Sequence, residues 1–181
     1  MYNHLMENYK EKFISSQKIY DGAVFSVTKD DVELTNGSIK FREVVHHRGG
    51  VVIAAIKDNK ILMVKQYRYP TQSALFELPA GKLDKKGETP FDAAKRELEE
   101  ETGHRAEKWT DLGFIWTTPG FCSEKLYLYK AENLTFVGQK PEEDEIINYF
   151  EFEKEKVFEM IKTGEINDSK SICAIMRAFF L

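Results

Sequence analysis

Hydrophobic and polar residues alternate along residues 23–45, as expected for two half-buried β-strands. The alternation is interrupted at Asn36-Gly37, the dipeptide that best tolerates the positive φ values of a tight hairpin turn. The pattern therefore predicts an N-terminal β-hairpin. Two continuous apolar runs follow at residues 51–56 and 61–66, joined by a polar turn at residues 57–60, and they indicate central strands of one sheet.

The rest of the pattern predicts a chain that mixes strands and helices. A short strand at residues 75–78 leads into Pro79-Ala80-Gly81. Thr89 suits the N-cap of a helix and Gly103 suits the position after its C-terminus, so we expect a helix over residues 90–102. The other expected elements are strands at 109–116, 125–131 and 146–152 and helices near 153–163 and 169–180.

Composition limits the classes of function. A chain of 181 residues, 42% of them apolar, can bury an ordinary globular core. The net charge of −4 argues against broad electrostatic binding to nucleic acid or to an anionic membrane surface. The N-terminus lacks the apolar stretch of a signal peptide, and the longest apolar run, residues 51–56, is far shorter than a membrane span, so we expect a cytoplasmic location.

Four glutamates lie close together on the predicted helix, at Glu97, Glu99, Glu100 and Glu101. At about 100° per residue, three of them share one face and Glu99 lies on another. Carboxylates about 4 Å apart repel by roughly 4 kcal/mol at an effective dielectric of about 20, so the cluster is either a solvated acidic stripe or a site that needs a compensating cation. Leu98 points toward the core from between them, which favours a hard divalent ion such as Mg²⁺ with a phosphate-containing substrate.

These glutamates belong to a longer motif that resembles the Nudix box, the pattern GX5EX7REUXEEXGU in which U is a bulky aliphatic residue. The matching positions are Gly81, Glu88, Arg96-Glu97-Leu98 and Glu100-Glu101-x-Gly103. Two differences stand out. Six residues rather than five separate Gly81 from Glu88, the extra one being a lysine, Lys85 or Lys86, and His104 takes the last aliphatic position.

The resemblance implies roles for several of these residues. The implied metal ligands are the Ala80 carbonyl and the carboxylates of Glu97, Glu100 and Glu101. Glu100 would be a direct ligand or an outer partner with a catalytic role, and Arg96 and Glu88 would orient the glutamates. The cofactor would be Mg²⁺, with Mn²⁺ as a possible substitute. From the residues alone, an ordinary surface ion pair stays open for Arg96.

Further segments resemble the ADP-ribose pyrophosphatase branch of this family. Pro119, 16 residues after Gly103, matches the proline marker of that branch, although a plain Pro-Gly turn is the alternative. The other matching segments are Lys65-Gln66-Tyr67-Arg68, Glu77-Leu78-Pro79-Ala80-Gly81, Gly164-Glu165-Ile166-x-Asp168-x-Lys170 and, in place of the usual HPGA, His47-Arg48-Gly49-Gly50. The resemblance implies substrate contacts for Arg68, Pro119 and Phe121, with core packing the alternative for Phe121.

An acidic run at residues 141–146 precedes a predicted strand, and such a run is usually a solvated loop. In similar ADP-ribose pyrophosphatases this loop carries the catalytic base, which implies Glu143 as base and Glu145 as a further metal ligand. A register shifted by one residue leaves Glu142 and Asp144 as rivals.

Residues and resemblance together predict an α/β fold with α and β mixed: a Nudix-type α/β/α sandwich around a mixed sheet over residues 49–181. Residues 1–48 would form a hairpin appendage that mediates a homodimer. The expected activity is Mg²⁺-dependent hydrolysis of the pyrophosphate bond of ADP-ribose, by attack of water on phosphorus, giving AMP and ribose 5-phosphate. The alternatives are another nucleoside diphosphate-linked substrate, such as a nucleotide hexose, and a Nudix-like nucleotide sensor without catalysis.

Overall fold

The computed structural model describes residues 10–139 and 147–180. Packing divides the chain into two compact units. The first contains the described part of residues 1–48 together with Thr118–Glu124, and the second contains Gly49–Thr117 and the described part of residues 125–181. No helix in the described ranges is long and apolar enough to cross a membrane.

The first unit is an antiparallel sheet in the order β1-β2-β3. The predicted hairpin is confirmed as β2 (Phe25–Glu33) and β3 (Ile39–His47), with Gly37 at a φ of 80° in the turn. No local pattern predicted β1 (Lys12–Asp21), because all ten of its residues are exposed and two register shifts break its alternation. A strand without a buried face lacks the periodic signal from which strands are recognised.

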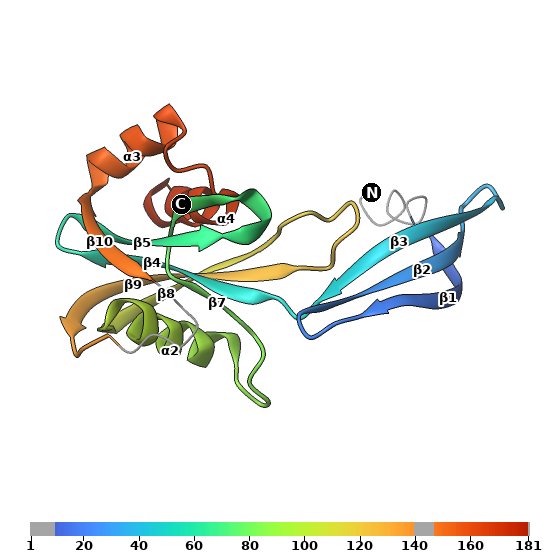
Figure 1. Ribbon diagram of the computed structural model, residues 1–181, viewed down its shortest axis with the longest axis horizontal. Helices are drawn as coiled ribbons and strands as arrows, with labels where there is room; N and C mark the ends of the chain where they lie inside the picture. Colours follow the sequence, from blue (N-terminus) through green and yellow to red (C-terminus); the bar gives the residue numbers. More distant parts are fainter. Residues whose placement is uncertain (1–9, 140–146, 181) are drawn as a thin grey trace, which may run out of the picture. The chain divides into compact units, whose positions relative to one another are not determined.

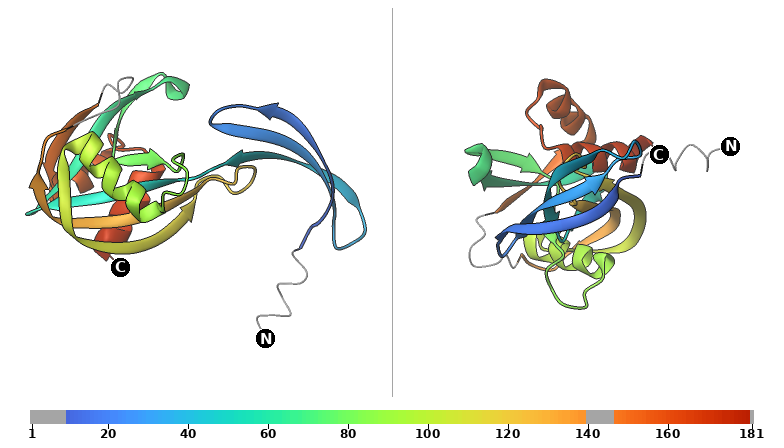
Figure 2. Two further views of the ribbon diagram at one scale, coloured as in Figure 1. Left: turned by 90° about the horizontal axis from the view of Figure 1, so that it is seen from below. Right: turned by 90° about the vertical axis from the view of Figure 1, so that its right-hand side faces the viewer.

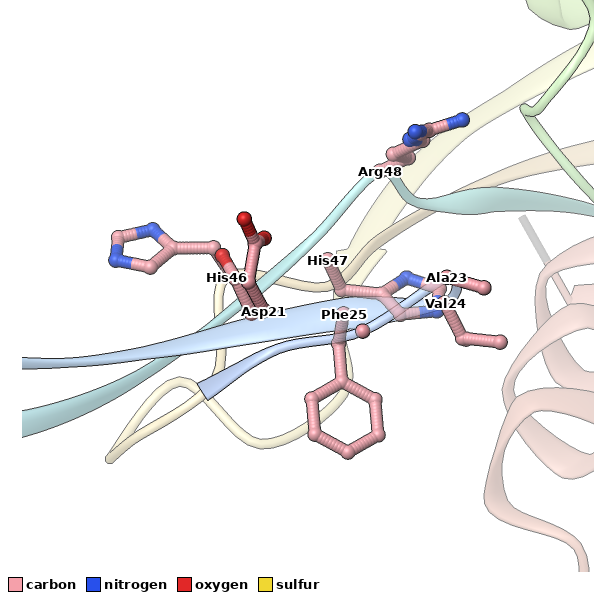
Figure 3. A pocket seen from close by; sticks show the side chains of 9 residues that line it. Asp21, Ala23, Val24, Phe25, His46, His47 and Arg48 are labelled. Carbon is pink, nitrogen blue, oxygen red and sulfur yellow. The ribbon is translucent and has the colours of Figure 1, made fainter. Parts of the chain in front are cut away.

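The segment 118–124 packs against the end of β3 inside the first unit. The Val45 amide donates to the Phe121 carbonyl at 2.8 Å, the Ser123 amide donates to the Val45 carbonyl at 2.9 Å, and the His47 amide donates to the Ser123 hydroxyl at 3.1 Å. Next to this junction, an open pocket is lined by the β1–β2 turn and by residues at the end of β3, including His46 and His47 (Figure 3).

The second unit is built on a mixed sheet. Its central strands lie in the order β10-β5-β4-β9-β8, while β6 pairs with β5 and β7 pairs with β4. The strands are β4 (Gly50–Lys57), β5 (Lys60–Arg68), β6 (Ser73–Glu77), β7 (Ala80–Lys82), β8 (His104–Trp116), β9 (Lys125–Phe136) and β10 (Asn148–Glu153), with a 3-10 turn at Tyr69–Thr71. The strands β4 and β9 are parallel and the other pairs are antiparallel.

Helices cover both faces of this sheet (Figures 1 and 2). The helix α2 (Pro90–Thr102) lies on one face, and α3 (Lys154–Thr163) and α4 (Ser169–Phe180) lie on the other. Because residues 51–55 of β4 are all buried, alternate side chains enter opposite cores: Val52 packs toward α3 and α4, and Ile53 packs toward α2. The predicted α/β/α sandwich is therefore confirmed.

The predicted strand boundaries were less accurate than the helix boundaries. The helix over residues 90–102 was correct at both ends, because Thr89 accepts the Asp92 amide and Gly103 ends the helix at a φ of 71°. By contrast, β8 begins five residues before the predicted 109–116 strand, and β9 continues five residues past 131. Most of β8 is exposed and Gly113 interrupts its pairing at a φ of 78°, so its alternation is weak.

Candidate functional site

The helix α2 brings its acidic face to the edge of the core. Ala94 and Leu98 are fully buried against the sheet. Glu97 and Glu101 lie next to them on the helix and are therefore only 8% and 2% exposed. Glu99 lies on the opposite side, where its carboxylate pairs with the exposed Arg105 guanidinium at 2.6 and 2.8 Å. The solvated acidic stripe is therefore wrong for Glu97 and Glu101.

The short strand β7 meets α2 at these two carboxylates. The Ala80 amide donates to Oε2 of Glu101 at 2.9 Å. A Cβ atom on Gly81 would lie 1.9 Å from the carboxyl carbon of Glu97, far inside van der Waals contact. Gly81 is therefore the residue that lets the backbone approach the Glu97 carboxylate. No strand was predicted here, because Ala80–Lys82 becomes a strand only by pairing with β4.

Arg96 is the cation that lies within the cluster. Its Nε and Nη2 donate to the two carboxylate oxygens of Glu88 at 2.8 and 3.0 Å, and its Nη1 donates to both Glu97 and Glu100 at 2.7 Å. These hydrogen bonds shift the pKa values of both partners. They hold the pKa of Glu88 below its usual value, and the bonds to Glu88, Glu100 and Glu97 raise the pKa of Arg96. With a side chain only 17% exposed, Arg96 is not an ordinary surface partner.

The donor set of this face fits a hard divalent ion. Glu101 accepts the Ala80 amide, Glu97 lies against Gly81, and Glu100 shares Arg96 with Glu97. Carboxylate oxygens are the ligands that Mg²⁺ and Mn²⁺ prefer. Within residues 10–139 and 147–180, no three His, Cys, Asp or Glu side chains are arranged around a common point. Arg96 engages Glu97 and Glu100, and the Ala80 amide engages Glu101, so the carboxylates face separate partners.

A second charged network lies beside the first. Arg68 donates through Nε and Nη2 to the two carboxylate oxygens of Glu77, each at 2.7 Å, and Lys170 of α4 also donates to Glu77. Burial alone would raise the pKa of Glu77, but the Arg68 hydrogen bonds and the Lys170 charge outweigh it and lower that pKa. The hydrogen bonds to Glu77 raise the pKa of Arg68, and the charge of Glu101 adds to this rise, so Arg68 also interacts electrostatically with the acidic face.

The same network holds the loop that leads into β7. Asp168 pairs with Lys170 at 3.0 Å and caps α4 by accepting the Ser171 amide at 3.1 Å. The Ser171 hydroxyl in turn accepts the Leu78 amide at 2.7 Å. Glu77, Asp168 and Lys170 had no predicted role beyond the family resemblance. The available signal was a charged residue at the end of an otherwise apolar strand, residues 75–78.

The other predicted site residues belong to the first unit or fall outside the described ranges. Pro119 and Phe121 belong to the first unit, where Phe121 is exposed and its carbonyl is tied to β3. Glu143 and Glu145, with their rivals Glu142 and Asp144, fall outside the described residues. The structure therefore brings together Arg96 and the implied metal ligands of β7 and α2, with Arg68 in the adjoining network.

His104, which takes an aliphatic position of the motif, is a buried polar residue. It is 1% exposed. The centroid of its ring lies 5.3 Å from that of Phe136 and 5.7 Å from that of Tyr149. Its Nδ1 lies 2.9 Å from the Thr102 carbonyl, while its Nε2 has no hydrogen-bond partner in the part of the chain that the structure describes. Burial lowers the pKa of His104 and favours the neutral ring.

The comparisons with known proteins agree with this geometry. A family model described as NUDIX domain matches residues 46–174, so the chain belongs to the Nudix family. The chain is 41% identical over 173 residues to an ADP-ribose pyrophosphatase of Bacillus subtilis, covering 94% of this chain and 93% of that protein. It is 42% identical over 170 residues to a methanol dehydrogenase activator of Bacillus methanolicus, covering 92% and 91%. A crystal structure of an ADP compounds hydrolase shares the fold, with a TM-score of 0.83 at 23% identity, covering 93% of this chain and 92% of that chain.

Replacing Gly81 by alanine tests the close approach of β7 to α2. The added Cβ would displace the Glu97 carboxylate, so we expect Gly81→Ala to weaken Mn²⁺ binding by about tenfold or more, with the fold retained. Calorimetric titration of the protein with Mn²⁺ measures this. Gly120→Ala, at a glycine with open space around it, serves as the control. Equal affinity in Gly81→Ala and the wild type would contradict the assigned role of Gly81.

His104→Leu tests the effect of the buried imidazole on stability. Burial lowers the pKa of His104 in the folded state, so the unfolded state binds the proton more readily. The wild type therefore keeps its full stability above pH 6.5, the pKa of the unfolded state. It loses stability as the pH falls from there through the lower pKa of the folded state. We expect the free energies of unfolding of His104→Leu and wild type to agree within about 1 kcal/mol at pH 7.5. Below pH 6.5 the wild type should lose more stability than the variant in urea titrations. Parallel pH profiles would show that His104 does not contribute.

Proposed function

We propose that this chain hydrolyses the pyrophosphate bond of ADP-ribose to AMP and ribose 5-phosphate in an Mg²⁺-dependent reaction. The observation that carries the proposal is the set of carboxylates that α2 holds against the backbone of β7, with Glu97 over Gly81 and Glu101 on the Ala80 amide. The similarity to the Bacillus subtilis ADP-ribose pyrophosphatase, over nearly the whole of both chains, supports the choice of substrate.

The acidic face would hold the metal. Glu97 and Glu101, with the Ala80 carbonyl, are the proposed direct ligands, and Glu100 is the proposed ligand or outer partner. A bound divalent ion, Mg²⁺ or its substitute Mn²⁺, would supply positive charge to the pyrophosphate oxygens and lower the pKa of a bound water. Arg96 positions two of these carboxylates, because one nitrogen, Nη1, donates to both Glu97 and Glu100.

Other residues would act on the substrate. The guanidinium of Arg68, held rigidly by Glu77, would contribute positive charge near the pyrophosphate. Pro119 and Phe121 are proposed substrate contacts. In the acidic run, Glu143 is proposed to accept the proton of the attacking water and Glu145 to add a metal ligand. A cytoplasmic location accompanies this proposal.

Two alternatives to ADP-ribose hydrolysis are separated by experiment. A nucleotide hexose as preferred substrate would release a sugar phosphate from that compound faster than from ADP-ribose. A nucleotide sensor would bind ADP-ribose and Mg²⁺ tightly in calorimetry and release no AMP. The similarity to a protein named as a methanol dehydrogenase activator is the observation that keeps a regulatory role under test.

We also propose that the first unit mediates a homodimer. Large apolar side chains of its sheet are exposed, among them Phe13 at 62%, Ile19 at 57% and Phe41 at 55%, whereas Val32 is its only buried apolar residue in the described ranges. A small sheet with so little core gains stability when a second surface covers its apolar side chains.

Glu101→Gln tests the catalytic proposal. Glutamine keeps an oxygen that can accept the Ala80 amide, so the fold should persist, but it lacks the charge that holds a divalent ion. We expect the release of AMP from ADP-ribose to fall by at least about 100-fold. Glu99→Gln makes the same charge change on the opposite face of α2 and should leave activity within about twofold of wild type. Full activity in Glu101→Gln would refute the assignment.

Phe41→Asp tests the proposed dimer. A charge placed on the exposed apolar surface of the first unit should weaken dimerisation by about tenfold or more. Sedimentation velocity over a range of protein concentrations measures the monomer fraction. Phe180→Asp, at an exposed aromatic residue of the second unit, is the matched control. A wild-type protein that sediments as a monomer at every concentration would exclude the dimer.

A further inference from the structure

The loop between β7 and α2 is one residue longer than the Nudix pattern, and a lysine from this loop reaches the acidic face. The ammonium of Lys85 lies 3.6 Å from Oε1 of Glu100. Its neighbour Lys86 forms no ion pair with any described residue. The lengthened loop therefore places one additional positive charge beside a proposed metal ligand.

In this arrangement both oxygens of Glu100 face cations. Oε2 accepts from Nη1 of Arg96 at 2.7 Å, and Oε1 faces Lys85. A divalent ion that approaches either oxygen of Glu100 therefore meets the repulsion of a positive charge already beside it. Arg96 is the fixed partner, because it donates four hydrogen bonds to three carboxylates and is largely buried. Lys85 is held by one long contact and is 46% exposed, so its contact is the weaker one.

We propose that Lys85 competes with the divalent ion for Glu100 and thereby sets the ion concentration at which the site fills. The inference rests on the proposed function, since it takes Glu100 as part of the metal site. A lysine is suited to this role because its ammonium sits on a flexible stem and can withdraw into solvent. While the Lys85 ammonium lies beside Glu100, its positive charge opposes the approach of a divalent ion. While no ion is bound, the same charge neutralises Glu100.

Binding of Mg²⁺ and of Mn²⁺, measured by calorimetry without substrate, tests the competition. At about 25 mM salt, Lys85→Gln should bind each ion about three- to tenfold more tightly than wild type, since it removes the positive charge and keeps a polar side chain. At about 250 mM salt the difference should shrink, because salt screens exposed charges. Lys85→Arg, which keeps the charge, should stay near wild type.

The matched control is Lys86→Gln, which removes the same charge from the next position of the loop. We expect its ion affinity to stay within about twofold of wild type. Equal shifts in Lys85→Gln and Lys86→Gln, or no shift in either, would overturn the competition while leaving metal-dependent hydrolysis intact. Unchanged ion affinity with a raised KM for ADP-ribose would make Lys85 a substrate contact instead. A wild-type protein that binds neither ion would overturn both this inference and the metal site of the proposed function.

Discussion

The packing of α2 places carboxylates at the edge of the core, and the fold of the second unit depends on partners that neutralise their charge. Leu98 and Ala94 must face the sheet, and helical geometry then places Glu97 and Glu101 where water reaches them poorly. An unpaired buried carboxylate is costly, so each finds a partner within the unit: the Arg96 guanidinium for Glu97 and the Ala80 amide for Glu101. The helix that stabilises the fold is therefore also the helix that assembles the candidate site.

The two charged networks hold the backbone around β7 between α2 on one face of the sheet and α4 on the other. Arg96 of α2 bonds to Glu88, at the end of the preceding loop, while Glu77 of β6 bonds to Arg68 and to Lys170 of α4. Ser171 of α4 fixes the backbone at Leu78, just before the strand. The backbone of β7 is thus anchored from both sides. This rigidity suits a site in which the position of backbone and carboxylate oxygens decides whether an ion binds.

Sequence reasoning predicted the parts of this structure that local signals determine. The helix over residues 90–102 was correct because Thr89 and Gly103 mark its ends chemically, and the central strands were found because both of their faces are buried. It failed where a strand exists only through its partner, as at Ala80–Lys82 and Lys12–Asp21. The glutamate face followed from helical spacing, but the sharing of Arg96 among three carboxylates depends on side-chain packing that no spacing rule contains.

The cations around Glu100 differ in a way that matters for a metal-dependent site. When no ion is bound, the clustered carboxylates need positive charge nearby so that their repulsion does not destabilise the fold. A cation that could not move away would, however, keep the ion from binding. Arg96 meets the first need, since it bonds at once to Glu88, Glu97 and Glu100 from a largely buried position. Lys85, exposed on the lengthened loop, would meet the second need, because its side chain gives up only one long ion pair when it moves away from Glu100. Under the proposed function, a fixed cation and a removable one would together keep the same acidic face stable before an ion binds and open to an ion when it arrives.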